Sequence, residues 1–102
     1  MNILFVCSRN QWRSPTAEAV YKNSGHSVRS AGMAESARIR INEGHVSWAD
    51  IIFVMERRHR DMLKARYEVK TPIIVLDIPD EYGYMDEELV SMIKDMVDPH
   101  LL

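Results

Sequence analysis

The stretch at residues 2–15 reads NILFVCSRNQWRSP and passes from an apolar run to the start of a helix. The apolar residues 2–6 predict a short buried strand. Ser14 and Pro15 are typical of an N-cap and a first helical position, so a helix over 15–24 should follow and end before Gly25. This order of strand, loop and helix is the unit from which α/β folds are built.

The rest of the chain alternates apolar runs with amphipathic ones. The further predicted elements are strands at 27–30, 50–55 and 72–76, helices over 56–67 and after a cap at Asp86, and one helix or helical turn within 34–47. The last helix should cover the sheet with an apolar stripe of Leu89, Met92, Ile93, Met96 and Val97. These elements predict one domain over residues 1–102, a three-layer doubly wound α/β fold with a four-stranded parallel sheet in the order 2-1-3-4.

The composition is that of an ordinary globular protein. The chain has 102 residues, of which 46% are hydrophobic and 27% charged, and its net charge of −2 gives no general attraction to nucleic acid or anionic membranes. One cysteine cannot form an intrachain disulfide, and the Cys and His residues show no zinc-binding spacing. No apolar stretch is long enough for a signal peptide or a membrane span. We therefore expect a cytoplasmic protein that needs no metal or other cofactor.

Residues able to do chemistry follow the predicted strands. Parallel strands end at one edge of the sheet, where α/β proteins bind their ligands. That edge should carry Cys7, the run Ser30-Ala31-Gly32, Glu56 and the loop 77–80. A candidate nucleophile and a candidate carboxylate, far apart in the sequence, are thus predicted to lie close together.

The loop between the first strand and the first helix has the features of an anion cradle. Its backbone N–H groups and the N-terminus of the helix would point to one spot, which favours both a bound oxyanion and a cysteine thiolate. Arg13 can give a two-pronged donor to a phosphate, Ser14 can donate to the sulfur, and Asn10 tolerates the left-handed backbone that such a loop needs. The expected substrate-binding residues of the loop are Ser8, Arg9, Asn10, Gln11, Trp12 and Ser14.

A plainer interpretation of Cys7 is a small buried hydrophobe at the end of a strand, which is a common role for a lone cysteine. That interpretation does not require an arginine six residues later, and it does not explain why the cysteine lies between a strand and a helix that begins with Ser-Pro. We therefore favour a nucleophile.

The chain resembles the low-molecular-weight protein tyrosine phosphatases over most of its length. The motifs that carry the resemblance are Cys7-x5-Arg13-Ser14-Pro15, Ser30-Ala31-Gly32, residues 49–56 and residues 78–84. The last of these looks like the acid loop of that family. The chain is shorter than is usual for the family, with segments missing between strands two and three and between strands three and four.

The resemblance implies a role for each matching residue. Cys7 would be the nucleophile, Arg13 the phosphate clamp and Asp80 the general acid, with Asp77 as the rival for the last role. Asn10, Ser14 and Ser30 would support the loop. Apart from the resemblance, Tyr82 and Tyr84 are candidates for one wall of the substrate cleft, and packing over the last helix is the alternative for both. The family's loop-bracing histidine has no clear counterpart, although His45 is a candidate. We expect the basic run after Glu56 to be a solvated helix face.

Three differences from the family pattern lie near the expected site. Trp12 replaces a second cysteine that is frequent in the family, and Arg9 replaces a small glycine of the loop. The third difference is that no aromatic residue follows Gly32. These changes bear on which substrate is chosen more than on phosphoryl chemistry.

The function we expect is that of a cysteine-dependent phosphomonoesterase, a protein tyrosine phosphatase-like hydrolase acting through a phosphocysteine. Its partners would be a phosphorylated protein, with phosphotyrosine as the family substrate, or a small phosphomonoester, and inorganic phosphate or sulfate would bind the loop. Nucleic acid and membrane are not expected partners, and the oligomeric state is left open. The alternatives are a non-catalytic phosphate- or oxyanion-binding module on the same fold and, less favoured with a single cysteine, an arsenate reductase.

Overall fold

The computed structural model describes residues 1–101 as alternating strands and helices. The strands are β1 (Asn2–Cys7), β2 (Ser27–Gly32), β3 (Ile51–Val54) and β4 (Ile73–Val75). The helices are α1 (Arg13–Tyr21), α2 (Glu43–Trp48), α3 (Arg57–Arg66) and α4 (Glu87–Leu101). Among these described helices, none is long and apolar enough to cross a membrane.

The four strands form one parallel sheet in the order β2-β1-β3-β4, as the sequence predicts. β1 lies in the middle, and its Phe5 is level with Ser30 of β2 and Phe53 of β3. Because all strands run the same way, Cys7 ends β1 directly beside Gly32 at the end of β2. The predicted functional edge of the sheet is therefore formed.

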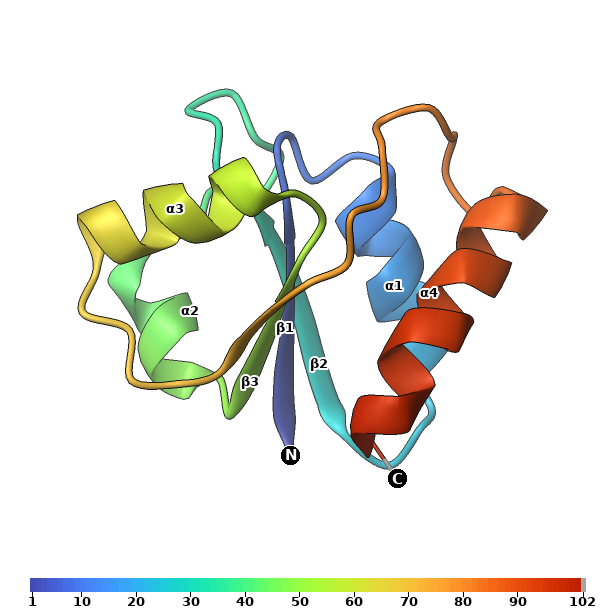
Figure 1. Cartoon of the computed structure of the whole chain (residues 1–102), viewed down its shortest axis with the longest axis horizontal. Coiled ribbons are helices and arrows are strands. Elements are labelled where there is room, and N and C mark those ends of the chain that lie inside the picture. Colours follow the sequence, from blue (N-terminus) through green and yellow to red (C-terminus); the bar gives the residue numbers. More distant parts are fainter. Residues whose placement is uncertain (102) are drawn as a thin grey trace.

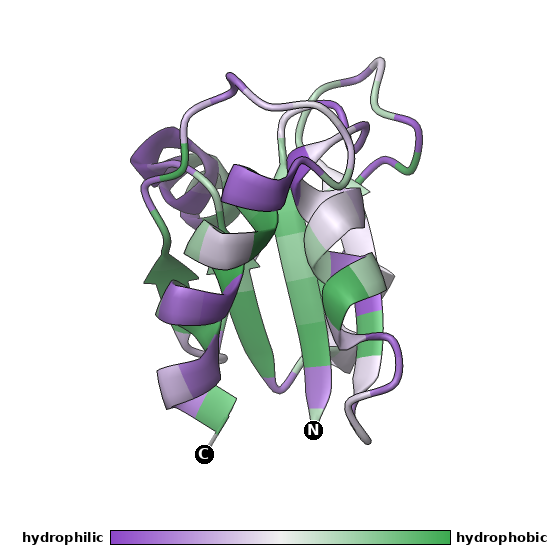
Figure 2. Ribbon diagram, turned by 90° about the vertical axis from the view of Figure 1, so that its right-hand side faces the viewer, coloured by the Kyte–Doolittle hydropathy of each residue, from purple (hydrophilic) through white to green (hydrophobic). Residues whose placement is uncertain are grey.

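Helices cover both faces of the sheet, with α1 and α4 on one side and α2 and α3 on the other (Figure 1). Alternate residues of β1 enter the two cores. Ile3, Phe5 and Cys7 pack with α1 and α4, whereas Leu4 and Val6 pack on the opposite side. A strand buried on both faces has an unbroken apolar sequence, which is why residues 3–6 are all hydrophobic. Figure 2 shows these hydrophobic strands enclosed between helices with hydrophilic segments.

Helix α1 begins earlier than predicted. Its first residue is Arg13 and its N-cap is Trp12, which makes no side-chain capping bond, so the assignment of Ser14 as N-cap is wrong. The hydroxyl of Ser14 is turned instead toward the sulfur of Cys7, 2.9 Å away. Pro15 is still accommodated, because the amides of a first helical turn have no partner within the helix. The helix ends at Tyr21, and Gly25 takes a φ of 90° in the turn that follows.

Helix α4 has the predicted cap, since Asp86 Oδ1 accepts hydrogen bonds from the amides of Glu88 (2.9 Å) and Leu89 (3.4 Å). Its buried face is narrower than predicted. Leu89, Ile93 and Val97 are fully buried and Met92 partly so, but Met96 is exposed. The buried row follows the i, i+4, i+8 spacing, which leaves Met96 at the margin of the contact with the sheet.

We predict that Gly32, at the end of β2, cannot carry a side chain. A Cβ there would lie 2.6 Å from both the Ser8 carbonyl oxygen and Ala37 Cβ. Gly32→Ala should therefore lower the free energy of unfolding by about 1–3 kcal/mol, measured by urea denaturation. Gly83→Ala is the matched control, because a Cβ at position 83 would meet no heavy atom within 4 Å. Equal effects of the two substitutions would contradict the prediction.

Candidate active site

The loop after β1 is held so that its carbonyl groups point outward. The carbonyls of residues 7–10 each accept a hydrogen bond from the segment 33–38, and the donors are Met33 N, Ala34 N, Arg38 N and Arg38 Nε, at 2.9, 2.9, 3.0 and 3.1 Å. In a planar trans peptide the N–H points opposite to the preceding C=O. The amides of residues 8–11 must therefore turn toward the inside of the loop. The amide of Asn10 does so, since it donates to Cys7 Sγ at 3.2 Å.

The sulfur of Cys7 lies among hydrogen-bond donors at the start of α1. Its side chain is 3% exposed, and Sγ is 2.9 Å from Ser14 Oγ. Ser14 Oγ accepts a hydrogen bond from Asn10 Nδ2 at 2.8 Å, and its own hydrogen has two acceptors within reach, the sulfur at 2.9 Å and the more distant Ala31 carbonyl at 3.4 Å. Donors of this kind at a helix N-terminus stabilise the thiolate, which is the nucleophilic form of cysteine.

Asn10 sets the curvature of the loop. Its φ is 56°, in the left-handed region that asparagine tolerates better than most residues. Its Nδ2 group donates to Ser14 Oγ and to Ser30 Oγ, at 2.8 and 2.9 Å, and Ser30 Oγ in turn donates to Glu18 Oε1 at 2.5 Å. The three residues expected to support the loop are thus brought together, with Glu18 added at the end of the chain of bonds.

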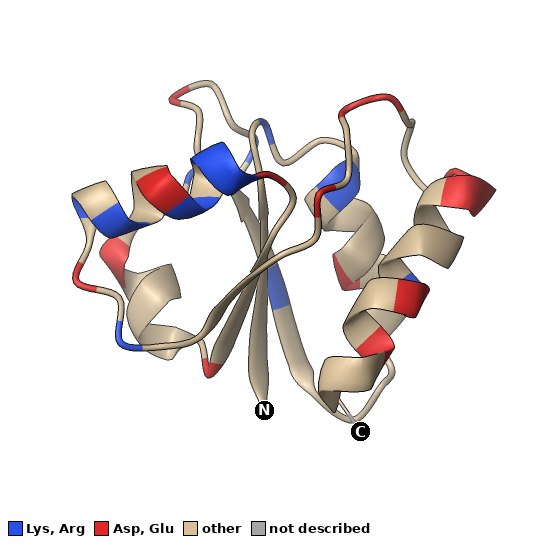
Figure 3. Ribbon diagram, in the orientation of Figure 1, with Lys and Arg blue, Asp and Glu red and all other residues tan. Residues whose placement is uncertain are grey.

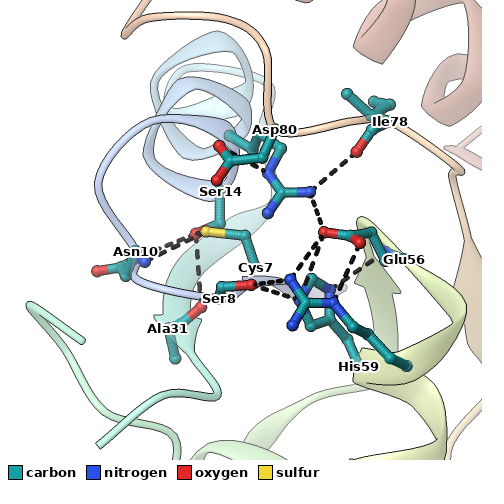
Figure 4. Close-up of polar contacts among 11 residues, drawn as sticks. Cys7, Ser8, Asn10, Ser14, Ala31, Glu56, His59, Ile78 and Asp80 are labelled. Atoms are coloured by element: carbon teal, nitrogen blue, oxygen red, sulfur yellow. Dashed lines mark hydrogen bonds and ion pairs between the residues drawn. The ribbon is translucent and has the colours of Figure 1, made fainter. Parts of the chain in front are cut away.

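Arg13 is the most deeply engaged charged residue of the site, with 2% of its side chain exposed. Its Nη1 donates to Glu56 Oε2 at 2.6 Å and to the Ile78 carbonyl at 2.9 Å (Figure 4). Its Nε is 3.6 Å from Asp80 Oδ1. No hydrogen bond within residues 1–101 uses Nη2, so part of the fork remains available to an anion.

Glu56 is a site residue that the sequence interpretation placed only at the edge of the sheet. It precedes α3 and binds two arginines, Arg13 and Arg58, with Arg58 Nε donating to Glu56 Oε1 at 3.1 Å. The hydrogen bonds from Arg58 and Arg13 lower the pKa of Glu56 to about 2, against the opposing effect of its burial. The carboxylate is therefore ionised at any physiological pH.

The start of α3 braces the loop, so the expectation of a solvated face is wrong for His59, which is buried, whereas Arg57 and Arg58 are exposed as expected. Ser8 Oγ accepts a hydrogen bond from Arg58 Nη2 at 2.8 Å and lies 2.9 Å from His59 Nε2. His59 Nδ1 accepts from the Glu56 amide at 3.1 Å, which leaves the ring proton on Nε2 to be donated to Ser8. Burial, above all, lowers the pKa of His59 to about 4, so the ring is neutral at pH 7.

The bracing histidine is His59 and not His45. His45 lies in the first turn of α2, where its Nδ1 accepts a hydrogen bond from the Asn42 amide at 3.1 Å. A signal for His59 does exist in the sequence, because it stands three residues after a carboxylate that ends a buried strand. Its contact with Ser8, 51 positions away, is set by the fold alone.

A small cavity lies at the centre of the site. Its volume is about 60 Å³, and it is lined by Cys7, Arg9, Gln11, Trp12, Arg13 and Asp80. That volume is about twice the share of one water molecule in the liquid, which suits a small anion. Asp77 does not line it; it borders a separate hollow with Glu56 and Pro79. Asp80, rather than Asp77, therefore lines the same cavity as Cys7.

Charges of opposite sign flank the site. Arginines of α3 lie on one side of the loop after β1. Carboxylates of α4 and of the segment before α4 lie on the other side (Figure 3). Residues 1–101 contain no cluster of three His, Cys, Asp or Glu side chains that could hold a metal ion.

The proteins to which this chain is similar carry the names of phosphatases. The low-molecular-weight protein-tyrosine-phosphatase PtpB of Staphylococcus aureus is 26% identical over 136 residues, covering 96% of this chain and 98% of PtpB. That alignment is longer than the chain, so PtpB has internal segments that are missing here. The protein-arginine-phosphatase of Geobacillus stearothermophilus is 29% identical over 79% of this chain and 78% of its own length. No protein-family model matches the sequence.

Solved structures agree with these relatives. The YwlE arginine phosphatase from Geobacillus stearothermophilus superposes with a TM-score of 0.78 and 27% identity, covering 98% of this chain and 92% of its own. The structure of Vibrio vulnificus Wzb in complex with benzylphosphonate also has a TM-score of 0.78, with 24% identity, 97% of this chain and 95% of that one covered. The second likeness supports the shared fold.

We predict that His59 makes the protein less stable in acid. Because its pKa of about 4 in the folded protein lies below the ordinary value of 6.5, the unfolded chain takes up a proton first as the pH falls. This difference should remove roughly 3 kcal/mol of stability between pH 7 and pH 4. Urea unfolding at several pH values should show a shallower pH dependence in His59→Gln than in the wild type.

The matched control for this experiment is His26→Gln. His26 stands just before β2, at the end of the strands away from the site. The pH profile should change less in this variant than in His59→Gln, because His26 is only partly buried whereas His59 is 1% exposed. Parallel profiles for His59→Gln and the wild type would mean that His59 is not buried as a neutral ring.

Proposed function

We propose that this chain, which is similar to the low-molecular-weight phosphatases, hydrolyses phosphomonoesters with Cys7 as the nucleophile. The observation that carries the proposal is the meeting of Cys7, Arg13 and Asp80 around one small cavity. A nucleophile, an anion clamp and a proton donor are the three groups that this reaction needs.

In the first step the Cys7 thiolate attacks phosphorus. The S–P bond forms while the bond from phosphorus to the leaving oxygen breaks, and Asp80 gives its proton to that oxygen. Arg13 and the inward-facing amides of residues 8–11 hold the other three phosphate oxygens, where negative charge is concentrated in the transition state. The products are the free alcohol or phenol and a phosphocysteine.

In the second step water attacks the phosphocysteine. The Asp80 carboxylate, left without a proton by the first step, takes one from the water. The S–P bond breaks, inorganic phosphate forms, and the sulfur leaves as a thiolate. Ser14 supports this departure by donating its hydroxyl hydrogen to the sulfur, from which it lies 2.9 Å. The positive charge comes from the loop and Arg13, so the mechanism uses no metal or other cofactor.

The substrates we propose are phosphorylated proteins, with small phosphomonoesters as the alternative. The relatives carry the names of tyrosine and arginine phosphatases. A non-catalytic oxyanion-binding module would need the same loop, but it would not need a carboxylate beside the sulfur, and the position of Asp80 favours the hydrolase. The unpaired Cys7 supports a reducing, cytoplasmic location.

We predict that Cys7→Ser abolishes turnover while leaving anion binding intact. A hydroxyl is a far weaker nucleophile than a thiolate, so hydrolysis of 4-nitrophenyl phosphate should fall at least about a thousandfold. Inorganic phosphate should still raise the melting temperature of the variant, because the loop amides and Arg13 remain. Undiminished activity in Cys7→Ser would overturn the proposal.

We predict that the effect of Asp80→Asn depends on the leaving group. Nitrophenolate leaves readily without a proton, whereas an alkoxide does not, so the loss of rate should be greater by about 10–100-fold for an alkyl phosphate than for 4-nitrophenyl phosphate. Asp77→Asn is the matched control, since Asp77 borders a different hollow. If Asp77→Asn showed the leaving-group dependence and Asp80→Asn did not, the acid would be Asp77.

A further inference from the structure

Trp12 is a large side chain left in solvent beside the catalytic loop. It is 46% exposed, although its backbone is fixed, since its carbonyl accepts a hydrogen bond from the Thr16 amide at 3.0 Å. It lines the small cavity that Cys7 also lines. It also lines a second hollow of about 250 Å³, together with Asp80, Glu81, Tyr82 and Gly83. The two hollows therefore meet at Trp12 and Asp80.

The second hollow lies where a leaving group would go. In an in-line displacement the leaving atom stands opposite the attacking sulfur. In the proposed mechanism that atom is the one that Asp80 protonates, and Asp80 borders both hollows. The rest of the leaving group then extends past Asp80 into the second hollow. A protein cavity of roughly 150 Å³ can hold a benzene molecule, so this hollow has room for a flat group.

The walls of the hollow suit a flat group better than a flexible one. Tyr82 is half-buried and packs against the core on the α1 and α4 side, which fixes one aromatic wall, and Trp12 supplies the other. Aromatic faces attract other rings and also planar cations. Asp80 and Glu81 add carboxylates at the rim, which a cationic group would meet.

We propose that Trp12 determines substrate specificity by stacking on a planar leaving group, an inference that rests on the proposed phosphatase function. The planar group is either the phenolic ring of a phosphotyrosine, whose P–O bond breaks, or the guanidinium of a phosphoarginine, whose P–N bond breaks as Asp80 gives its proton to the nitrogen. Both groups present a flat π-face. Trp12 stands in the catalytic loop, and the residues just after Gly32 provide no aromatic wall. Trp12 therefore supplies that wall from the loop itself.

The kinetic test compares planar with alkyl leaving groups. In Trp12→Ala, the kcat/KM for phosphotyrosine or phosphoarginine should fall about 3- to 10-fold relative to that for phosphoserine, mainly through a higher KM. Trp12→Phe should restore most of the preference, because it keeps an aromatic face. If Trp12→Ala lowered kcat/KM equally for all three substrates, the proposal would be overturned, whereas the phosphatase function would stand.

The same assay provides a control and distinguishes phosphoarginine from phosphotyrosine as the source of the planar group. Trp48→Phe should leave the substrate preference unchanged, since Trp48 packs on the α2 and α3 side beneath the Arg29 guanidinium. If the preference concerns phosphoarginine, Glu81→Gln should weaken it by removing a rim carboxylate. If it concerns phosphotyrosine alone, Glu81→Gln should not reduce it.

A binding test does not depend on turnover. In the Cys7→Ser, Trp48→Phe double variant, Trp12 is the only tryptophan, because the chain has two. Benzylphosphonate should change its fluorescence much more than methylphosphonate at equal saturation, since only the former carries a ring. Equal changes with the two phosphonates would overturn the proposal even in a chain that hydrolyses none of the substrates.

Discussion

The site depends on a guanidinium that is buried at the edge of the sheet. A buried charge is tolerated only when it is paired and hydrogen-bonded. Arg13 meets this requirement with Glu56 from the end of β3 and with the Ile78 carbonyl and Asp80 from the loop after β4. The pairing therefore brings the catalytic loop, the start of α3 and the acid loop to one place. Removal of Glu56 would take the 2.6 Å ion pair from a guanidinium that is only 2% exposed, whereas Asp80, 3.6 Å away and 52% exposed, is the weaker partner.

The loop keeps its shape at a local cost. Asn10 Oδ1 is buried and is the one buried side-chain polar atom in residues 1–101 that has no hydrogen-bond partner. An unpaired amide oxygen costs about 1–3 kcal/mol. Both hydrogens of Asn10 Nδ2 are used, on Ser14 and Ser30, and these bonds orient the hydroxyl that faces the sulfur. The cost falls on the residue that positions the nucleophile, which is where strained or unsatisfied groups are commonly found.

The sequence predicts the fold well because the strands are short, apolar and buried on both faces, and because the order of elements restricts the topology. It predicts the loop because its motif is local. It does not predict His59 as the brace, since that contact joins residues 51 positions apart and arises only when α3 is laid across the end of β1. The wrong prediction of Ser14 as N-cap has a related cause. The fold of the loop places the Ser14 hydroxyl next to the sulfur of Cys7 and not next to the helix amides.

The short length of the chain is compatible with an intact site because the contacts that shape the loop come from residues next to the sheet edge. The segment after β2 supplies a hydrogen bond to each carbonyl of residues 7–10, and Gly32 exchanges backbone hydrogen bonds with Ile39 and Ile41, which hold that segment in place. α3 follows β3 directly, so Glu56 and His59 reach the loop without any longer connection. The internal segments that PtpB has in addition are therefore not needed to orient the amides or Arg13. A shorter chain can lose side chains that would surround the leaving group. An aromatic residue in the loop itself, Trp12, compensates for that loss without lengthening the chain.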